Sequence, residues 1–168
     1  MKQAIVDIHI LKEKVVIYFA DNHFAITPNT YTEFNLYLNK KLDEHEINKI
    51  KRFDEYQKHL NYAINLLSQY AYTHKKLTDK LNKRNVDINT QKKIMAYLDE
   101  HKLLDDHAFA ANYALTLLSR HQGPLLIKKR LMELGINDSD IAYAINNLKE
   151  KNLNEALSNY LKRLDQQY

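Results

Sequence analysis

The sequence predicts a mostly α-helical protein, built of tandem three-helix repeats in an elongated array and preceded by a small N-terminal β-meander plus short helices. Three observations favour this class: short β-rich apolar runs precede Pro28, helical spacing of apolar residues follows it, and the chain matches itself at an offset of about 50 residues. With two Gly and two Pro among 168 residues, of which 45% are hydrophobic, collagen-like and flexible low-complexity sequences are excluded.

The first expected domain covers residues 1–53. Two polar segments of hairpin length separate three β-rich runs, and Pro28 follows the third run, which is typical of a small antiparallel meander. One or two short helices are expected in residues 29–53, where Asp43 and Glu46 have the spacing of a capping box.

The rest of the chain divides into repeats. Residues 54–104 form the first expected three-helix repeat, residues 105–152 the second, and residues 153–168 the first helix of an incomplete third repeat. The match is ordered: Tyr62-Ala63-x-x-Leu66-Leu67-Ser68 recurs as Tyr113-Ala114-x-x-Leu117-Leu118-Ser119. Because only one helix of the third repeat is present, the chain either ends in a fragment of a repeat or is part of a longer protein.

Helix-end signals locate the helices of the second repeat at about residues 106–121, 124–134 and 139–149. Pro124 suits the first helical position, whose N–H has no partner in the helix, and Gly135 suits the left-handed position after a helix. Asp105 and Asp106 open the first of these helices and Asp138 the third. In the first repeat, Thr73 takes the place of Gly123 as the cap.

The residues give little support to an enzyme. The absence of Cys excludes disulfides, zinc–thiolate sites and thiol nucleophiles, and two isolated Gly cannot build a phosphate-binding loop. Asp105, Asp106 and His107 could in principle hold a metal for phosphodiester hydrolysis, but neighbouring residues on a helix do not converge, and capping explains both carboxylates. No two His stand at the i, i+4 metal-binding spacing. We therefore predict no catalytic residues, no metal site and no cofactor.

Basic residues recur on the second helix of both repeats, although the formal net charge is only +4. In the first repeat, Lys76, Lys80 and Lys83 stand at i, i+4 and i+7 and therefore form a stripe along one face of the helix. Repeated basic helices on stacked modules suit the phosphates of a strand or a filament, whereas for any single one of these residues solubility is the better explanation. The candidate DNA-binding residues are Lys76, Lys80, Lys83, Arg84, Arg120, Lys128, Lys129 and Arg130.

Six tyrosines could stack on bases: Tyr62, Tyr70, Tyr72, Tyr97, Tyr113 and Tyr143. Tyr62 and Tyr113 match each other across the repeats at apolar spacing, which favours a core position for both.

Two stretches of the second repeat resemble the RecX family of bacterial recombination regulators. The stretches are Leu104-Asp105-Asp106-x-x-Phe109-Ala110-x-x-Tyr113 and Gly123-Pro124-x-x-Ile127-x-x-x-Leu131-x-x-x-Gly135-Ile136. The first repeat is similar to the preceding RecX repeat, and the β-rich N-terminus resembles the extension of members from Gram-positive bacteria.

This resemblance implies a non-enzymatic negative regulator of RecA. Such a protein binds the RecA–single-stranded-DNA filament and modulates its ATPase, strand-exchange and coprotease activities in homologous recombination and SOS DNA repair. It also binds single-stranded DNA and possibly double-stranded DNA. We expect a monomer. A place in the bacterial cytoplasm is expected because no apolar run approaches the length of a membrane span and the N-terminus does not resemble a signal peptide. The alternative is a helical-repeat protein that binds DNA independently of RecA.

Overall fold

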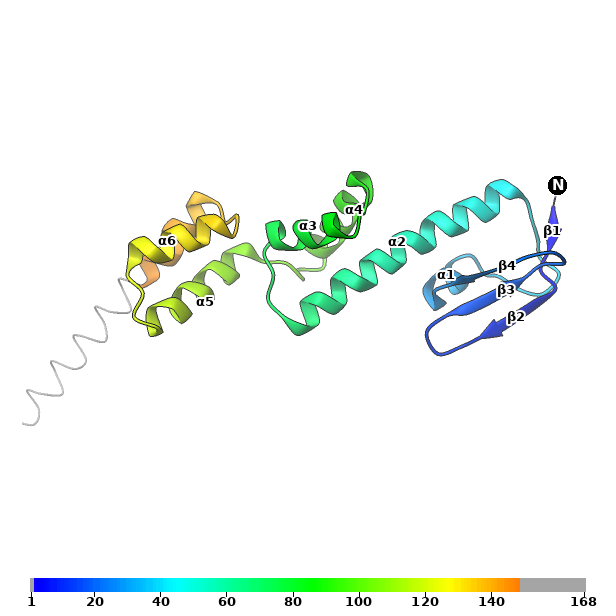
Figure 1. The fold of residues 1–168 in the computed structure, drawn as a ribbon, viewed down its shortest axis with the longest axis horizontal. Coiled ribbons are helices and arrows are strands. Elements are labelled where there is room, and N and C mark those ends of the chain that lie inside the picture. The colour runs from blue at the N-terminus through cyan, green and yellow to red at the C-terminus, as the bar shows by residue number, and fades with distance from the viewer. Residues whose placement is uncertain (1, 149–168) are drawn as a thin grey trace, which may run out of the picture. The chain divides into compact units, whose positions relative to one another are not determined.

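The computed structural model describes residues 2–148 of the chain. The chain divides into two compact units, Met1–Leu66 and Leu67–Tyr168, and one long helix continues across their boundary (Figure 1). Each unit has its own buried residues. The expected first helix of a third repeat, within residues 153–168, lies outside the described residues.

The first unit contains the predicted meander. Strands β2 (Asp7–Ile10), β3 (Val15–Tyr18) and β4 (His23–Ile26) form an antiparallel sheet in the order β2-β3-β4. Val15 of the central strand pairs with Ile10 on one side and with Ile26 on the other. Three consecutive residues of β3 are buried, whereas β2 is largely exposed, so the sheet has its core on the central strand.

A second, two-stranded ladder was not predicted. Strand β1 (Gln3–Ala4) pairs antiparallel with β5 (Lys41–Leu42), far along the chain, with Gln3 opposite Leu42 and Ala4 opposite Lys41. Strands of two residues are too short to show alternation of apolar and polar side chains, so this long-range pairing left no pattern in the sequence.

A buried carboxylate joins helix α1 (Pro28–Glu33) to helix α2 (Glu44–Gln69). Asp54 of α2 accepts hydrogen bonds from the Thr27 backbone N–H at 2.6 Å and from the Thr30 hydroxyl at 3.0 Å. The Lys58 ammonium, one turn further along α2, lies 2.7 Å from the other oxygen of this carboxylate. All three partners therefore compensate the desolvation of the buried charge.

Helix α2 differs from the short helices expected in this part of the chain, because it is 26 residues long. The predicted capping box begins it: the Glu46 N–H bonds to the Asp43 carboxylate, and the Asp43 N–H bonds to the Glu46 carboxylate, both at 2.8 Å. The helix then passes through residue 53, where the sequence placed the end of the first domain. No Gly or Pro stands between residues 44 and 69, so nothing in the local sequence interrupts it.

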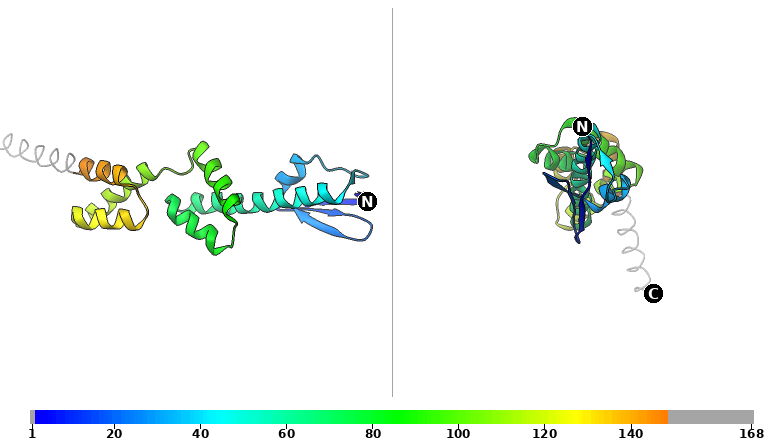
Figure 2. Two further views of the ribbon diagram at one scale, coloured as in Figure 1. Left: turned by 90° about the horizontal axis from the view of Figure 1, so that it is seen from above. Right: turned by 90° about the vertical axis from the view of Figure 1, so that its right-hand side faces the viewer.

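The second unit consists of helices. They are α3 (His74–Lys83), α4 (Ile88–Glu100), α5 (Asp106–Ser119), α6 (Pro124–Glu133) and a further helical segment at residues 138–148 (Figure 2). Helix α3 packs on α4, and α5 packs on α6.

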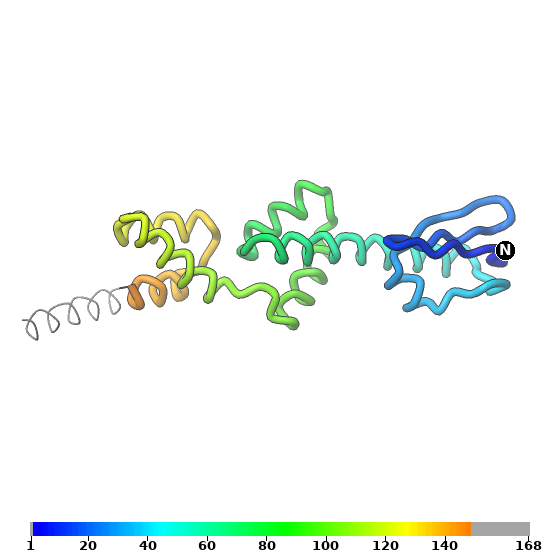
Figure 3. The backbone as a smooth tube through the Cα atoms, turned by 90° about the horizontal axis from the view of Figure 1, so that it is seen from below, coloured from blue at the N-terminus to red at the C-terminus, as the bar shows by residue number. Residues whose placement is uncertain are grey.

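Burial in this unit repeats at the offset that the sequence predicted. Five buried positions of α3, α4 and the turn between them have buried counterparts 50 residues later: Leu77 and Ile127, Leu81 and Leu131, Val86 and Ile136, Ile94 and Ala144, Leu98 and Leu148. The tube through the backbone shows the corresponding helix–turn–helix path twice (Figure 3). The predicted class of tandem helical repeats behind an N-terminal strand region is confirmed.

The helix ends explain why these helices begin and stop where they do. Thr73 caps α3 by accepting from the Lys76 N–H at 3.2 Å, and Pro124 is the first residue of α6. After α6, Gly135 has φ +79° and its N–H bonds to the Met132 carbonyl at 2.9 Å. Asn85 occupies the same left-handed position after α3, with φ +56°. Both second helices therefore end in the same way.

One expected cap is different. Asp138 was predicted to open the third helix of the second repeat, but the Asn137 side-chain oxygen accepts the Asp140 N–H at 2.9 Å instead. An Asn fills this role as well as an Asp, so the two neighbouring candidates could not be separated by residue type.

Candidate nucleic-acid interface

The three lysines of the predicted stripe lie on the exposed side of α3. Lys76, Lys80 and Lys83 are all exposed, whereas Leu77 and Leu81 on the same helix are fully buried. The amphipathic spacing that fixes the two leucines in the core therefore turns the ammonium groups towards solvent.

The other five predicted residues are also exposed. Arg84 and Arg120 are the C-terminal caps of α3 and α5, and three consecutive residues lie on α6: Lys128, Lys129 and Arg130. Cations near helix C-termini interact favourably with the helix dipole, so part of their placement has a structural cause.

A surface groove brings the three α3 lysines together with aromatic side chains. It has a volume of about 470 Å³ and is lined on α3 by Lys76, Asp79, Lys80 and Lys83. The connection between α2 and α3 forms its other wall with Tyr70, Ala71 and Tyr72. Three ammonium groups face one carboxylate in this groove, which gives it an excess of positive charge. Arg120 and the basic residues of α6 do not line it.

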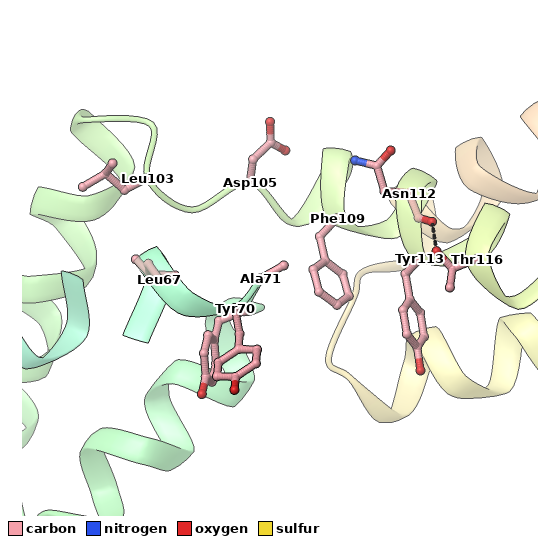
Figure 4. A pocket seen from close by; sticks show the side chains of 10 residues that line it. Leu67, Tyr70, Ala71, Leu103, Asp105, Phe109, Asn112, Tyr113 and Thr116 are labelled. Carbon is pink, nitrogen blue, oxygen red and sulfur yellow. Dashed lines mark hydrogen bonds between the residues drawn. The ribbon is translucent and has the colours of Figure 1, made fainter. Parts of the chain in front are cut away.

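A second hollow adjoins the first, because both are lined by Tyr70, Ala71 and Tyr72. Its volume is about 360 Å³, and α5 contributes Phe109 and Tyr113 to its wall (Figure 4). The two rings of α5 are stacked, with centroids 5.5 Å apart and an angle of 22° between their planes. We call the two hollows together the aromatic–basic groove.

The sequence predicted only part of this groove. Its lysines were candidates from their spacing, and Tyr70 and Tyr72 were among the tyrosines considered for stacking. Tyr113 was expected in the core, and it is half-buried: its ring packs against the core of the second repeat and also lines the groove. Phe109 was not predicted as a site residue, because an aromatic residue at helical spacing is normally core.

Contacts between the start of α3 and the end of α6 join the two repeats next to the groove. The Thr73 hydroxyl donates to the Leu134 carbonyl oxygen at 2.8 Å, and the Lys75 ammonium donates to the Glu133 carbonyl oxygen at 3.0 Å. A Cβ added to Gly135 would lie 2.6 Å from the Lys75 Cβ, so the two backbones approach closely here. We call this contact the inter-repeat joint.

His74 adds an ionic contact between the two repeats, separate from the joint. Its Nε2 lies 2.6 Å from Asp99 of α4, and its Nδ1 lies 3.1 Å from Asp106 of α5. Burial disfavours the charged imidazole, but the hydrogen bonds and negative charges of the two carboxylates outweigh burial and raise the pKa of His74 above 6.5. The protonated ring can donate to both carboxylates, which lie on either side of the connection between the repeats.

The residues considered for a metal-dependent nuclease do not converge. Asp105 caps α5 by accepting from the Ala108 N–H at 2.8 Å, and Asp106 contacts His74. The His107 ring points elsewhere, to Asp140 at 2.7 Å. Within residues 2–148, no group of three or more His, Asp or Glu is placed to hold a metal ion. Over the same residues, no helix is long and apolar enough to cross a membrane.

These features define a helical-repeat protein with an N-terminal β-meander and an aromatic–basic groove on its repeats. No family model matches the chain. Proteins named Regulatory protein RecX do: one from Leuconostoc mesenteroides is 34% identical over 128 residues, which are 74% of this chain and 48% of the relative. One from Streptococcus pneumoniae is 31% identical over 146 residues, which are 85% of this chain and 55% of the relative.

Solved structures agree with these relatives. A crystal structure of regulatory protein RecX superimposes with a TM-score of 0.76 at 27% identity, covering 87% of this chain and 74% of that one. A crystal structure of RecX from Lactobacillus salivarius gives a TM-score of 0.56 at 28% identity, covering 66% of this chain and 77% of that one. The chain belongs to the RecX family of regulatory proteins. It spans about half the length of the curated relatives it matches.

Proposed function

We propose that this chain acts as a negative regulator of RecA. It binds the RecA–single-stranded-DNA filament and lowers the filament's ATPase, strand-exchange and coprotease activities, and so modulates homologous recombination and SOS repair. The observation that carries the proposal is the exposed basic second helix in both repeats of a chain whose relatives are named as RecX regulators. The regulator itself needs no cofactor and no catalytic residue, because its effect comes from binding alone.

The electrostatics of the repeats support binding to a polyanion. All eight candidate residues are exposed, and both second helices carry several of them, with Lys80 and Arg130 at the repeat offset of 50 residues. Part of this charge lies beside aromatic rings in the aromatic–basic groove, which adds an apolar surface to the cationic one.

The test is single-stranded-DNA-stimulated ATP hydrolysis by RecA of the same organism, titrated with this protein at fixed salt. We expect inhibition at amounts well below those that coat the DNA. A triple variant, Lys76→Gln with Lys80→Gln and Lys83→Gln, should inhibit less, and its DNA affinity should depend less on salt. The slope of log K against log salt should fall by about 2, because each lost phosphate contact removes about 0.7 on a single strand.

A matched control removes the same charge elsewhere. Lys12, Lys14 and Lys49 are exposed residues of the first unit, and their triple Gln variant should inhibit like the wild type. If both triple variants lose inhibition equally, only the net charge matters, and the stripe on α3 is not a binding site.

The second candidate function is DNA binding without RecA. The same exposed basic helices favour it, since they would suffice to hold phosphates. Inhibition that appears only when the protein coats the DNA, and that disappears when DNA is in excess, would support this alternative against filament regulation.

A further inference from the structure

The aromatic–basic groove combines two surfaces that suit two parts of one ligand. At one end lie the rings of Tyr70, Phe109 and Tyr113, and at the other end lie the ammonium groups of α3. Tyr70 and its neighbours line both hollows, so a ligand can pass from the rings to the lysines without leaving the surface. The ligand class that this arrangement fits carries flat apolar groups and anionic groups close together.

The aromatic end is held in place and accessible. Phe109 and Tyr113 are half-buried and pack against the core of the second repeat, which restricts their movement. Their rings leave α5 on the same side of the helix, and Tyr70 belongs to the opposite wall of the hollow (Figure 4). Tyr70 is 68% exposed as a whole residue, so its ring is accessible to a planar partner.

The basic end has the spacing of a backbone-binding track. Lys76 and Lys80 are one turn apart on α3, Lys83 follows in the next turn, and Asp79 is the acidic residue among them. At the aromatic end, Asp105 also lines the hollow, but its carboxylate already accepts a hydrogen bond from the Ala108 N–H as the N-cap of α5. The positive charge is thus concentrated at one end and the aromatic surface at the other.

We propose that the aromatic–basic groove binds unpaired nucleotides, with bases against Tyr70, Phe109 and Tyr113 and with backbone phosphates along the α3 lysines. In a duplex the base faces are covered by their neighbours, so only an unpaired strand can use both ends of the groove. The groove therefore gives this chain a preference for single-stranded over double-stranded nucleic acid. This inference rests on the nucleic-acid binding in the proposed function. It adds the aromatic rings that distinguish single-stranded from double-stranded nucleic acid.

The test compares three fluorescent probes of equal length, about 20 nucleotides, bound by the full chain without RecA: an oligothymidine strand, an abasic strand of the same charge, and a duplex. The Tyr70→Ala variant should bind the oligothymidine strand about 5- to 100-fold more weakly, because stacking contributes strongly for each base. Its binding to the abasic strand and to the duplex should not change. The Phe109→Leu variant, which keeps an apolar side chain for the core, should behave in the same way.

The matched control is Tyr37→Ala. Tyr37 is 56% exposed but lies in the first unit, outside the groove, so all three probes should bind this variant like the wild type. The inference is overturned if the abasic strand binds as tightly as oligothymidine, or if Tyr70→Ala weakens all three probes equally. It is also overturned if no strand binds and a peptide of alternating Glu and Phe does, which would make the groove a protein-docking surface.

Failure of the inference is separable from failure of the proposed function. The probes report on base stacking without RecA, whereas the ATPase titration reports on the filament. Loss of RecA inhibition with intact, Tyr70-dependent strand binding would refute only the proposed function. Full RecA inhibition by Tyr70→Ala with equal binding of abasic and thymidine strands would refute only the inference.

Discussion

Replacing Gly135 by Ala perturbs the inter-repeat joint at its tightest point. The substitution forces a non-Gly residue into φ +79°, which costs about 1–2 kcal/mol. It also places a Cβ 2.6 Å from the Lys75 Cβ, whose position the backbone fixes, so the backbones of the joint must move apart, and such overpacking costs about 1–3 kcal/mol. We expect the free energy of unfolding of the second unit to fall by about 2–5 kcal/mol in total.

The assay is hydrogen exchange of the α6 backbone amides, followed by mass spectrometry. Exchange should accelerate about 30- to 4,000-fold, because each 1.4 kcal/mol changes the open population tenfold. Gly135→Asn separates the two causes, since Asn tolerates the left-handed region as Asn85 does in the first repeat but carries the same Cβ, so it should lose only the steric part, about 1–3 kcal/mol.

Gly123→Ala is the matched control for the same chemical change. Gly123 has φ −72°, and a Cβ there would meet nothing within 4 Å. Ala lowers the entropy of the unfolded chain, which stabilises the fold, and it is a weaker N-cap, which destabilises it; both effects are below about 1 kcal/mol, so little change is expected. The reasoning is refuted if Gly135→Ala is no more damaging than Gly123→Ala, or if Gly135→Asn is as damaging as Gly135→Ala.

Two further predictions concern buried and ionic contacts. Asp54→Ala leaves the Thr27 N–H and the Thr30 hydroxyl buried without this acceptor, so the free energy of unfolding of the first unit should fall by about 3–5 kcal/mol, as measured by hydrogen exchange of the β3 amides. The control is Glu55→Ala at an exposed position of the same helix, which should change this free energy by less than about 0.5 kcal/mol. Because the pKa of His74 is raised in the folded chain, its stabilising effect is complete below about pH 6.5 and is lost as the pH rises through the folded pKa. Urea unfolding of wild type and His74→Gln should therefore differ more at about pH 6 than at about pH 8, and equal differences would contradict the ionic role of this ring.

The features predicted from the sequence are those that local spacing determines. Leu77 and Leu81 lie in the core because of the helical period, and the caps at Thr73 and Asp105 follow from residue type next to that period. The offset between repeats was visible because each buried position of one repeat has its counterpart in the next.

The features missed depend on residues that are far apart in the chain. The ladder between β1 and β5 and the burial of Asp54 both require packing that no local pattern encodes. The aromatic–basic groove required the inter-repeat joint, because Tyr70 and Phe109 come from different repeats and share a hollow only when α3 contacts the end of α6. Spacing along α3 identified the lysines, but it could not show that they lie close to the aromatic rings of α5.

The inter-repeat joint also affects how freely this chain can vary during evolution. Thr73 donates to one carbonyl and accepts from the Lys76 N–H, so it needs a side chain that does both, and an Asp at this cap could not donate. On the other side, the acceptors are the backbone carbonyls of Glu133 and Leu134, which every amino acid provides. Mutations at these two positions therefore leave both hydrogen bonds of the joint in place, although the Leu134 side chain also packs against the core, while selection on the spacing of the repeats acts on Thr73 and Gly135.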